Sequence, residues 1–378
     1  MMAAVVLPSL TGCSGFFPAV TATSPTSPTS PATGANSVYV ANLTTTSLNG
    51  FTVGTGALTA IVGLPVALPA EPFAMAITPT NSFLYVACLG GIFQYTINTD
   101  GTITASTTSS PAVTVSSMAV SPDGGWLIGL DSTTEQLDIF KIAATTGALS
   151  SVNAPTTYTI PSGMWTPSAV RVSPNGLFII AALGTAGDVV FPFNTGTGVA
   201  GTPVNLAPLT TTTSDNGLAI DSKSAYVYIA RSGTQGGVAV YSLAANGLLT
   251  AVSASPFAAG SGTFDIILDT TGTYVYAANR ADGTISGYTI VPGATTAGLT
   301  LTPLAGSPYT SGVGVRSLGV DRTGTYLLAA ALGDAQNTVP PDLTVYSFST
   351  TTPGELVSPI TQATDTDPAG AFAIVLTP

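Results

Sequence analysis

A short apolar strand pattern that ends in a small residue recurs along this chain. It occupies residues 38–41, 84–87, 126–129, 178–181, 227–230, 275–278 and 327–330, and most copies contain an aromatic residue. The closing small residues are separated by 46, 42, 52, 49, 48 and 52 positions. A period of this length is typical of stacked supersecondary units that each contact their neighbours. The sequence therefore predicts a repeat protein of seven units.

Each unit has the same internal order of strands and turns. An opening strand leads into a turn such as Ser121-Pro122-Asp123-Gly124, and the aromatic strand follows it. Such turns place Asp, Asn or Ser where a side chain can bond the backbone, and Gly where φ is positive. A third strand, a second Gly-containing turn and a fourth strand complete the unit. Seven four-stranded antiparallel units predict an all-β, seven-bladed β-propeller.

The two ends of the chain favour a closed ring over an open solenoid. The first unit begins at its aromatic strand and lacks the opening strand that the other units have. Residues 371–378 match residues 72–79, an opening strand, in character at each position. If the C-terminal strand completes the N-terminal blade, the ring leaves no exposed sheet edges. We therefore expect the C-terminal strand to pair within the first blade.

The strand Tyr39-Val40-Ala41-Asn42 and the turns at 121–124 and 173–176 resemble those of bacterial seven-bladed propellers of the lactonase family. That family is named after 6-phosphogluconolactonase and includes a fungal muconate lactonising enzyme. The resemblance covers about residues 36–378 and implies a propeller fold with lactone chemistry as an expected activity. The cyclising members are associated with a His, Glu and Arg constellation. The chain has no His, so that constellation is not transferred to it.

Charge is scarce throughout the sequence. Among 378 residues there are 7 Lys or Arg, 18 Asp or Glu and no His, which gives a formal net charge of -11. An acidic chain with so few cations cannot neutralise a run of phosphates, which argues against nucleic-acid binding. The absence of His excludes imidazole as a base, proton shuttle or metal ligand. No cofactor motif is found, and we expect neither a cofactor nor a metal ion.

The N-terminal residues have a different character from the repeats. Residues 1–13 form an apolar stretch that ends in Leu-Thr-Gly-Cys and resembles a lipoprotein signal, with Cys13 as the lipidation site. Residues 14–35 are rich in Ser, Thr and Pro and predict an extended tether before the propeller at 36–378. This organisation predicts a cell-envelope lipoprotein, periplasmic or at the outer membrane, that contacts the membrane only through its lipid. The alternative is a disordered tail with a chance Cys.

The candidate site lies at one mouth of the predicted channel. Residues just before innermost strands and just after second strands reach that face, and Arg231, Arg280 and Arg316 occupy such positions. Arg171 replaces the small residue found at its place in other innermost strands. Carboxylates expected nearby are those of Glu71, Asp215, Asp265 and Asp282.

These side chains admit three interpretations. Arg paired with a carboxylate can be a structural tie, because the planar guanidinium bonds two oxygens. Alternatively, the arginines form an anion-binding or lactone-binding mouth, or the charges are scattered and solvated. Cys88 is expected to be a buried, inert thiol.

Two functions follow from these interpretations. The first is a monomeric binding propeller whose partner is a small anionic or lactone ligand, or a cell-envelope protein. The second is a lactone hydrolase in which Arg280 and Arg316 orient an anion and Asp265 activates water, with Arg231, Arg171, Glu71, Asp215 and Asp282 binding the ligand.

Overall fold

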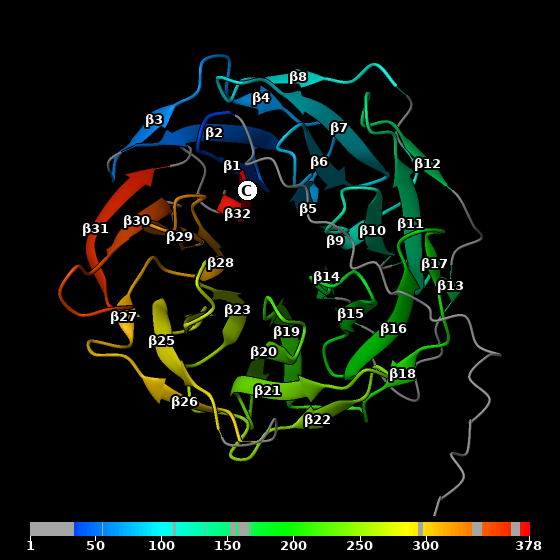
Figure 1. The fold of residues 1–378 in the computed structure, drawn as a ribbon. Coiled ribbons are helices and arrows are strands. Elements are labelled where there is room, and N and C mark those ends of the chain that lie inside the picture. The colour runs from blue at the N-terminus through cyan, green and yellow to red at the C-terminus, as the bar shows by residue number, and fades with distance from the viewer. Residues whose placement is uncertain are drawn as a thin grey trace, which may run out of the picture.

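Seven antiparallel sheets surround a central channel in the computed structural model (Figure 1). The structure describes residues 34–54, 56–108, 111–131, 133–151, 156–157, 166, 168–293, 298–334, 342–363 and 371–378. Each sheet runs outward from an innermost strand at the channel to a short strand at the rim. The fold is the predicted seven-bladed propeller.

The strands fall into four concentric layers. The innermost strands are β5 (Pro72–Ile77), β9 (Val115–Val120), β14 (Ala169–Val172), β19 (Thr213–Ile220), β23 (Thr263–Leu268), β28 (Val315–Val320) and β32 (Ala371–Leu376). The second strands are β1 (Ser37–Asn42), β6 (Phe83–Cys88), β10 (Trp126–Asp131), β15 (Phe178–Ala182), β20 (Tyr226–Gly233), β24 (Tyr274–Asn279) and β29 (Tyr326–Ala331). These second strands carry the repeated pattern seen in the sequence.

The outer half of each blade contains the third and fourth strands. The third strands are β2 (Ser47–Val53), β7 (Gly91–Ile97), β11 (Gln136–Ile142), β16 (Asp188–Asn194), β21 (Gly237–Leu243), β25 (Thr284–Val291) and β30 (Asp342–Phe348). The fourth strands are β3 (Leu58–Ala60), β8 (Ile103–Ala105), β12 (Leu149–Ser151), β17 (Val199–Ala200), β22 (Leu249–Ala251), β26 (Thr300–Pro303) and β31 (Leu356–Ala363). In four blades a further short segment also pairs with the third strand, which the sequence did not predict. These segments are β4 (Val66–Ala67), β13 (Thr156–Thr157), β18 (Val204–Asn205) and β27 (Tyr309–Thr310).

The C-terminal strand closes the ring as predicted. Strand β32 pairs antiparallel with β1, with Val38 opposite Leu376 and Ala41 opposite Ala373. Figure 1 shows the two strands side by side at the channel. At their lower end, the Ser37 backbone N–H donates to Thr377 Oγ1 at 2.9 Å. The first blade is therefore assembled from both ends of the described chain.

The predicted turns have the backbone that their residues require. Gly124, Gly176, Gly272 and Gly324 follow the innermost strands of four blades and have φ between 67° and 72°. A residue with a side chain is strained there, because this is the left-handed region. These turns lie at the lower ends of the blades, opposite the predicted mouth.

Aromatic residues on the second strands connect neighbouring blades. Tyr39, Tyr85 and Tyr276 are buried, and each donates its hydroxyl hydrogen to a backbone carbonyl of the next blade, at 2.6, 2.7 and 2.6 Å. Trp126 Nε1 donates to the carbonyl of Thr195 at 2.6 Å. A buried hydroxyl needs such a partner, so the rings both fill the space between blades and fix their register. The aromatic residues of the second strands thus serve interblade packing.

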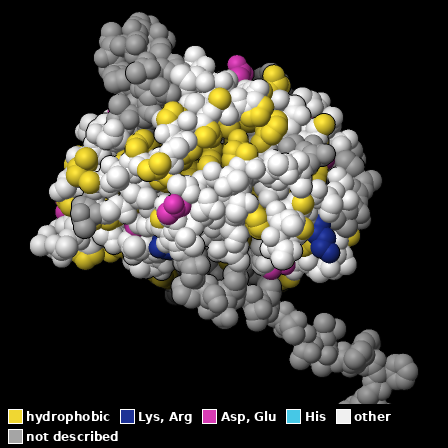
Figure 2. All heavy atoms as spheres, turned by 90° about the horizontal axis from the view of Figure 1, so that it is seen from above, with side chains coloured by type: hydrophobic (Ala, Val, Ile, Leu, Met, Phe, Trp, Pro, Cys, Tyr) yellow, Lys and Arg dark blue, Asp and Glu magenta, His cyan; other side chains and the backbone are white. Residues whose placement is uncertain are grey.

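The outer surface carries little charge. Figure 2 views the edge of the disc and shows mostly uncharged polar side chains and backbone, with hydrophobic side chains among them and few charged ones. The described part of the chain contains no helix with the length and hydropathy needed to cross a membrane.

Candidate functional site

One residue from each blade lines the upper mouth of the channel. We call these seven residues the mouth ring: Phe73, Ser116, Ser168, Asn216, Phe264, Arg316 and Phe372. They surround a cavity of about 320 Å³. The side chains divide into an arc of aromatic rings with one arginine and an arc of hydroxyl and amide groups. The mouth therefore combines apolar, polar and cationic surfaces.

A β-bulge places six of these residues. In every innermost strand except β14, the pairing with the second strand shifts by one residue at the mouth-ring position. For example, Val315 is opposite Ala331 and Ser317 is opposite Ala330, so Arg316 is the extra residue. A bulge redirects a side chain that regular pleating would point elsewhere. The mouth is thus built by a repeated irregularity of the backbone.

Arg316 is the only charged residue of the mouth ring. Its Cζ lies 3.6 Å from the ring centroid of Phe372 and 4.9 Å from that of Phe264. Burial, followed by the nearby Arg280, lowers the pKa of Arg316 to about 10, so the guanidinium remains charged at neutral pH. Among the described residues, no carboxylate forms an ion pair with Arg316. Arg316 is thus a partly desolvated cation held mainly by aromatic rings.

Asp265 lies directly below the mouth ring. Its Oδ1 accepts a hydrogen bond from the Ile266 backbone N–H at 2.9 Å, and its Oδ2 accepts one from Leu318 N–H in the next blade at 2.8 Å. Ser117 and Ser317 occupy the equivalent position in other blades and also accept from the next blade, at 3.0 and 3.2 Å. Asp265 is therefore an interblade link whose carboxylate also faces the channel.

The charge state of Asp265 reflects two opposing influences. Burial raises its pKa and is the larger influence, so the pKa stays above its usual value although Arg171, the two backbone N–H donors and Arg316 lower it. A carboxylate that accepts backbone hydrogen bonds is stabilised in its charged form. Asp265 is the only carboxylate among the described residues that line the mouth cavity.

Arg171 faces the channel at a deeper level. It pairs with Ile180, at the position that Ala76, Ala119 and Ala219 occupy in other blades. It lines the mouth cavity and both cavities below it. One of its guanidinium nitrogens donates to the carbonyl of Val170 at 2.9 Å. Arg171 therefore lies in the channel and not between blades.

Arg280 lies outside the mouth ring and next to it. It is exposed just after β24, and its Cζ is 5.3 Å from the ring centroid of Phe264. It lines an outer cavity of about 550 Å³ that shares Phe264 and Asn216 with the mouth cavity. Arg280 and Arg316 are thus brought to one sector of the upper face, as expected, but in adjoining cavities.

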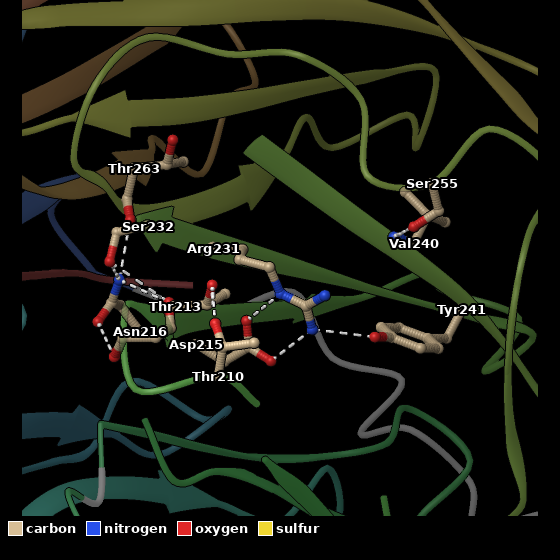
Figure 3. Close-up of polar contacts among 11 residues, drawn as sticks. Thr210, Thr213, Asp215, Asn216, Arg231, Ser232, Val240, Tyr241, Ser255 and Thr263 are labelled. Atoms are coloured by element: carbon tan, nitrogen blue, oxygen red, sulfur yellow. Dashed lines mark hydrogen bonds and ion pairs between the residues drawn. The ribbon is translucent and has the colours of Figure 1, made fainter. Parts of the chain in front are cut away.

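Arg231 does not join that sector. Strand β20 continues to Gly233, so Arg231 lies on the strand rather than in the loop after it. Its Nε donates to Asp215 Oδ1 at 2.6 Å, and one terminal nitrogen donates to Asp215 Oδ2 at 2.7 Å and to the Tyr241 hydroxyl at 2.9 Å (Figure 3). Arg231 is 6% exposed and Asp215 is 0% exposed. This bidentate pair has the geometry of a structural tie.

A third charged residue, Asp188, completes this buried network from the preceding blade. Asp188 is 1% exposed, and its Oδ1 has no hydrogen-bond partner. Burial and the adjacent Asp215 raise the pKa of Asp188 well above its usual range. Burial beside a second carboxylate therefore favours the protonated form of Asp188. No sequence pattern pointed to this residue, because an Asp at the start of a third strand is ordinary until the neighbouring blade is placed against it.

The remaining candidates lie away from the mouth cavity. Glu71 is exposed before β5, and Asp282 is exposed in the loop after β24, where its Oδ2 accepts from Ser261 N–H at 2.6 Å. Cys88 is 0% exposed, and burial raises the pKa of its thiol to about 11, which fits the expected inert thiol. Cys13 lies outside the described residues. No cluster of metal-ligating side chains occurs within the described ranges.

The sequence did not identify the aromatic half of the mouth. Phe73, Phe264 and Phe372 each precede a small or acidic residue near the start of an innermost strand. A regular strand would turn alternate residues toward the channel, and only the bulge gives these side chains their position. A recurrent Phe at that position in three opening strands is the signal that could have indicated it.

Comparisons with known proteins identify the fold. No family profile matches the sequence, and no curated protein matches it. Among solved structures, a protein from Lactobacillus plantarum has a TM-score of 0.72 and 17% identity over 90% of this chain and 99% of its own. A "putative 6-phosphogluconolactonase" from Bacteroides uniformis has a TM-score of 0.71 and 16% identity, with 90% and 99% coverage.

A periplasmic gluconolactonase from Pseudomonas aeruginosa is also similar, with a TM-score of 0.66 and 15% identity over 88% of this chain and 97% of its own. At these identities the similarity concerns the architecture, and function does not follow from fold alone. The structural neighbours of this chain are thus 6-phosphogluconolactonase-like seven-bladed propellers.

Proposed function

We propose that this protein binds a small anionic molecule at the mouth of its channel. The observation that carries the proposal is the position of Arg316, a partly desolvated guanidinium without a carboxylate ion pair among the described residues. Arg171 adds a second positive charge to the same cavity, and among the described residues Asp265 adds the only negative one. The mouth cavity therefore carries an excess of positive charge, although the chain has only 7 cationic residues and a net charge of -11.

The packing of Arg316 supports binding by its N–H edge. The Arg316 Cζ lies over the rings of Phe372 and Phe264, and no carboxylate of the described residues forms an ion pair with its donors. A planar guanidinium presents donors in a fork that matches carboxylate or phosphate oxygens. An anion in the mouth would restore to Arg316 part of the solvation lost on folding.

Lactone hydrolysis is the second candidate, favoured by the carboxylate of Asp265 in the same cavity as Arg316. In that reaction Asp265 would accept a proton from water as the water attacks the lactone carbonyl, and Arg316 would stabilise the oxyanion. Both Asp265 oxygens already accept backbone hydrogen bonds, which compete with a catalytic water for the same lone pairs, although burial raises the pKa of the carboxyl group overall. Simple binding needs no such base and is the function we favour.

For the whole protein we propose an exported binding protein anchored through lipidated Cys13 and acting as a monomer. Its partner would be a small anion or lactone, or a cell-envelope protein. The support is the sequence resemblance of residues 1–13 to a lipoprotein signal. Mass spectrometry of protein from its native host tests this, since an acylated chain beginning at Cys13 is expected and an unprocessed Met1 terminus contradicts it.

Calorimetric titration with butyrate and with inorganic phosphate tests the binding site. We expect dissociation constants on the order of 1 mM, because one guanidinium provides most of the contact energy. Arg316→Gln should abolish measurable binding. Lys223→Gln, which removes an exposed charge at the opposite face, is the matched control and should bind as the wild type does. Equal binding by the Arg316 variant and the wild type would refute the proposal.

A further inference from the structure

The outer cavity is bounded by the upper loops of two consecutive blades. In one blade the Arg280 N–H donates to the Gly262 carbonyl at 3.0 Å, and in the next the Gly333 N–H donates to the Val313 carbonyl, also at 3.0 Å. A Cβ atom at Gly262 would lie 2.9 Å from that of Ala281, so this close approach requires glycine. Backbone hydrogen bonds thus preform the walls. At about 550 Å³ the cavity has the size of a small-molecule site.

The surface of the outer cavity is mainly apolar. The side chains of Val313 and Leu332, the methyl group of Ala281 and the ring of Phe264 line it. Val313 is 45% exposed, which leaves an aliphatic side chain in contact with water. Covering such a surface with an apolar ligand is favourable in proportion to the area removed from water. The cavity therefore suits a ligand with an apolar body.

The polar side chains of the outer cavity are engaged with the protein itself. Asn216 Nδ2 donates to Ser232 Oγ at 3.0 Å and to the Thr263 carbonyl at 2.9 Å (Figure 3). Ser214 Oγ donates to Asn216 Oδ1 at 3.1 Å. Because these groups already have partners, they do not require polar atoms from a ligand. A ligand rich in hydroxyl groups would gain little from this wall.

Arg280 is the only charged residue that the described part of the chain contributes to the outer cavity. Its side chain is exposed, and no carboxylate of the described residues forms an ion pair with it. The nearby Asp282 instead accepts a hydrogen bond from the Ser261 backbone N–H at 2.6 Å. A single available cation beside an apolar surface matches a ligand that has one anionic group and a hydrocarbon body.

We propose that the outer cavity is a second ligand site, which takes a medium-chain monocarboxylate. Arg280 binds the carboxylate, and the hydrocarbon chain packs against Val313 and Leu332. The site goes beyond the proposed anion binding at Arg316, because it lies in a separate cavity and draws its affinity mainly from apolar contact. A small anion in the mouth needs no hydrocarbon body.

Calorimetric titration with hexanoate, octanoate and 1-octanol, below the concentrations at which micelles form, tests the ligand class. Two additional buried CH₂ groups should make octanoate bind roughly tenfold more tightly than hexanoate. Octanol should bind about threefold more weakly than octanoate, the factor expected of one exposed charged contact. In Arg280→Gln the acid and the alcohol should bind alike. Equal binding of octanoate and octanol by the wild type would refute the anionic part of the proposal.

Val313→Ser tests the position of the hydrocarbon chain. Loss of this apolar surface should weaken octanoate binding about fivefold. Val291→Ser is the matched control, since Val291 is 40% exposed at the end of β25 and does not line the outer cavity. It should bind octanoate as the wild type does. Both valines are exposed, so both variants should keep the thermal transition of the wild type.

Arg316→Gln separates the outer cavity from the mouth. This variant should lose phosphate binding and keep octanoate binding. Octanoate binding that disappears in Arg316→Gln and is unchanged in Val313→Ser would place the acid in the mouth and overturn this inference. Equal binding of hexanoate and octanoate, or no binding of either, would also overturn it. Phosphate binding that depends on Arg316 would in those cases leave the proposed function intact.

Discussion

The charged residues of this chain are used in two opposite ways. Arg231 is fully paired, with both of its hydrogen bonds to Asp215 shorter than 2.8 Å, and it lies inside a blade. Arg316 is stacked between Phe264 and Phe372, without a carboxylate ion pair among the described residues. Removing one member of a buried pair strands the other charge, whereas a stacked arginine keeps its donors for a ligand. The contacts of each guanidinium therefore distinguish a stabilising arginine, Arg231, from a candidate ligand-binding one, Arg316.

Asp188→Asn should make stability less dependent on pH. The folded-state pKa of Asp188 is raised by burial and by Asp215, so its stabilising contribution is complete below about pH 3.8 and is lost as pH rises toward the folded pKa. An amide cannot ionise and still has an N–H to donate to Asp215. We expect the free energy of unfolding at pH 8 to increase by on the order of 1–3 kcal/mol, the usual cost of an unsatisfied buried polar group.

Urea unfolding at pH 4.5 and pH 8 measures this effect. Glu135→Gln, which replaces a carboxyl group by an amide at an exposed position, is the control. It should leave the free energy of unfolding unchanged at pH 4.5 and at pH 8. If Asp188→Asn destabilises the protein equally at both pH values, Asp188 is not the protonated member of the network.

Within the innermost strands, one position links three of the blades to the blade that follows each of them. Ser117, Asp265 and Ser317 occupy it in three blades, and each accepts a hydrogen bond from the following innermost strand. A serine therefore performs in two blades the structural task that a carboxylate performs in another. The equivalence makes it possible to remove the charge of Asp265 without removing the link.

Asp265→Ser should keep the fold and change the chemistry of the mouth. The serine hydroxyl can accept from Leu318 N–H, so the melting temperature should fall by only about 2 °C, whereas Asp265→Ala should lower it further. Binding of butyrate should tighten, because Asp265 is the only carboxylate that the described residues contribute to the cavity. Weak hydrolysis of lactones that disappears in Asp265→Ser, while the fold is retained, would instead favour the hydrolase.

Much of the fold was predictable from the sequence, and the reasons are local. The turn at 121–124 and the aromatic strands recur at a regular period, and their backbone requirements are met within a few residues of chain. Arg171 was also recognisable, because it interrupts a series of small residues. The bulge that places Phe264 and Arg316 was not recognisable from the sequence. A shift of one residue in strand pairing moves a side chain to the opposite face of the sheet, and in a short strand this leaves no pattern.

At the scale of the whole molecule, the ring is closed by a single terminal strand. Strand β32 provides the innermost strand of the first blade and three residues of the upper cavity wall, Phe372, Ala373 and Ile374. It also packs against the core shared by the first and last blades, where Ala371 and Ile374 are buried. The closing strand thus contributes to both stability and the candidate site.

Deletion of residues 371–378 should prevent formation of a cooperative native state. It removes the partner of β1 and exposes the apolar surfaces of both neighbouring blades, so an insoluble product is expected. Adding a synthetic peptide of the same residues during refolding should restore solubility and the thermal transition. A truncated protein that melts as the wild type does would show that β32 is dispensable for closure.

Ser37 and Thr377 meet at the lower end of the first blade, while Arg316 and Phe264 stand at the upper mouth. Whatever precedes Gly34 therefore joins the disc on the side away from the opening. If the protein is held by that end, the disc faces outward, with its opening toward the surrounding medium and its turn-rich underside toward the support. A ligand would then reach the arginines without passing between the protein and its point of attachment.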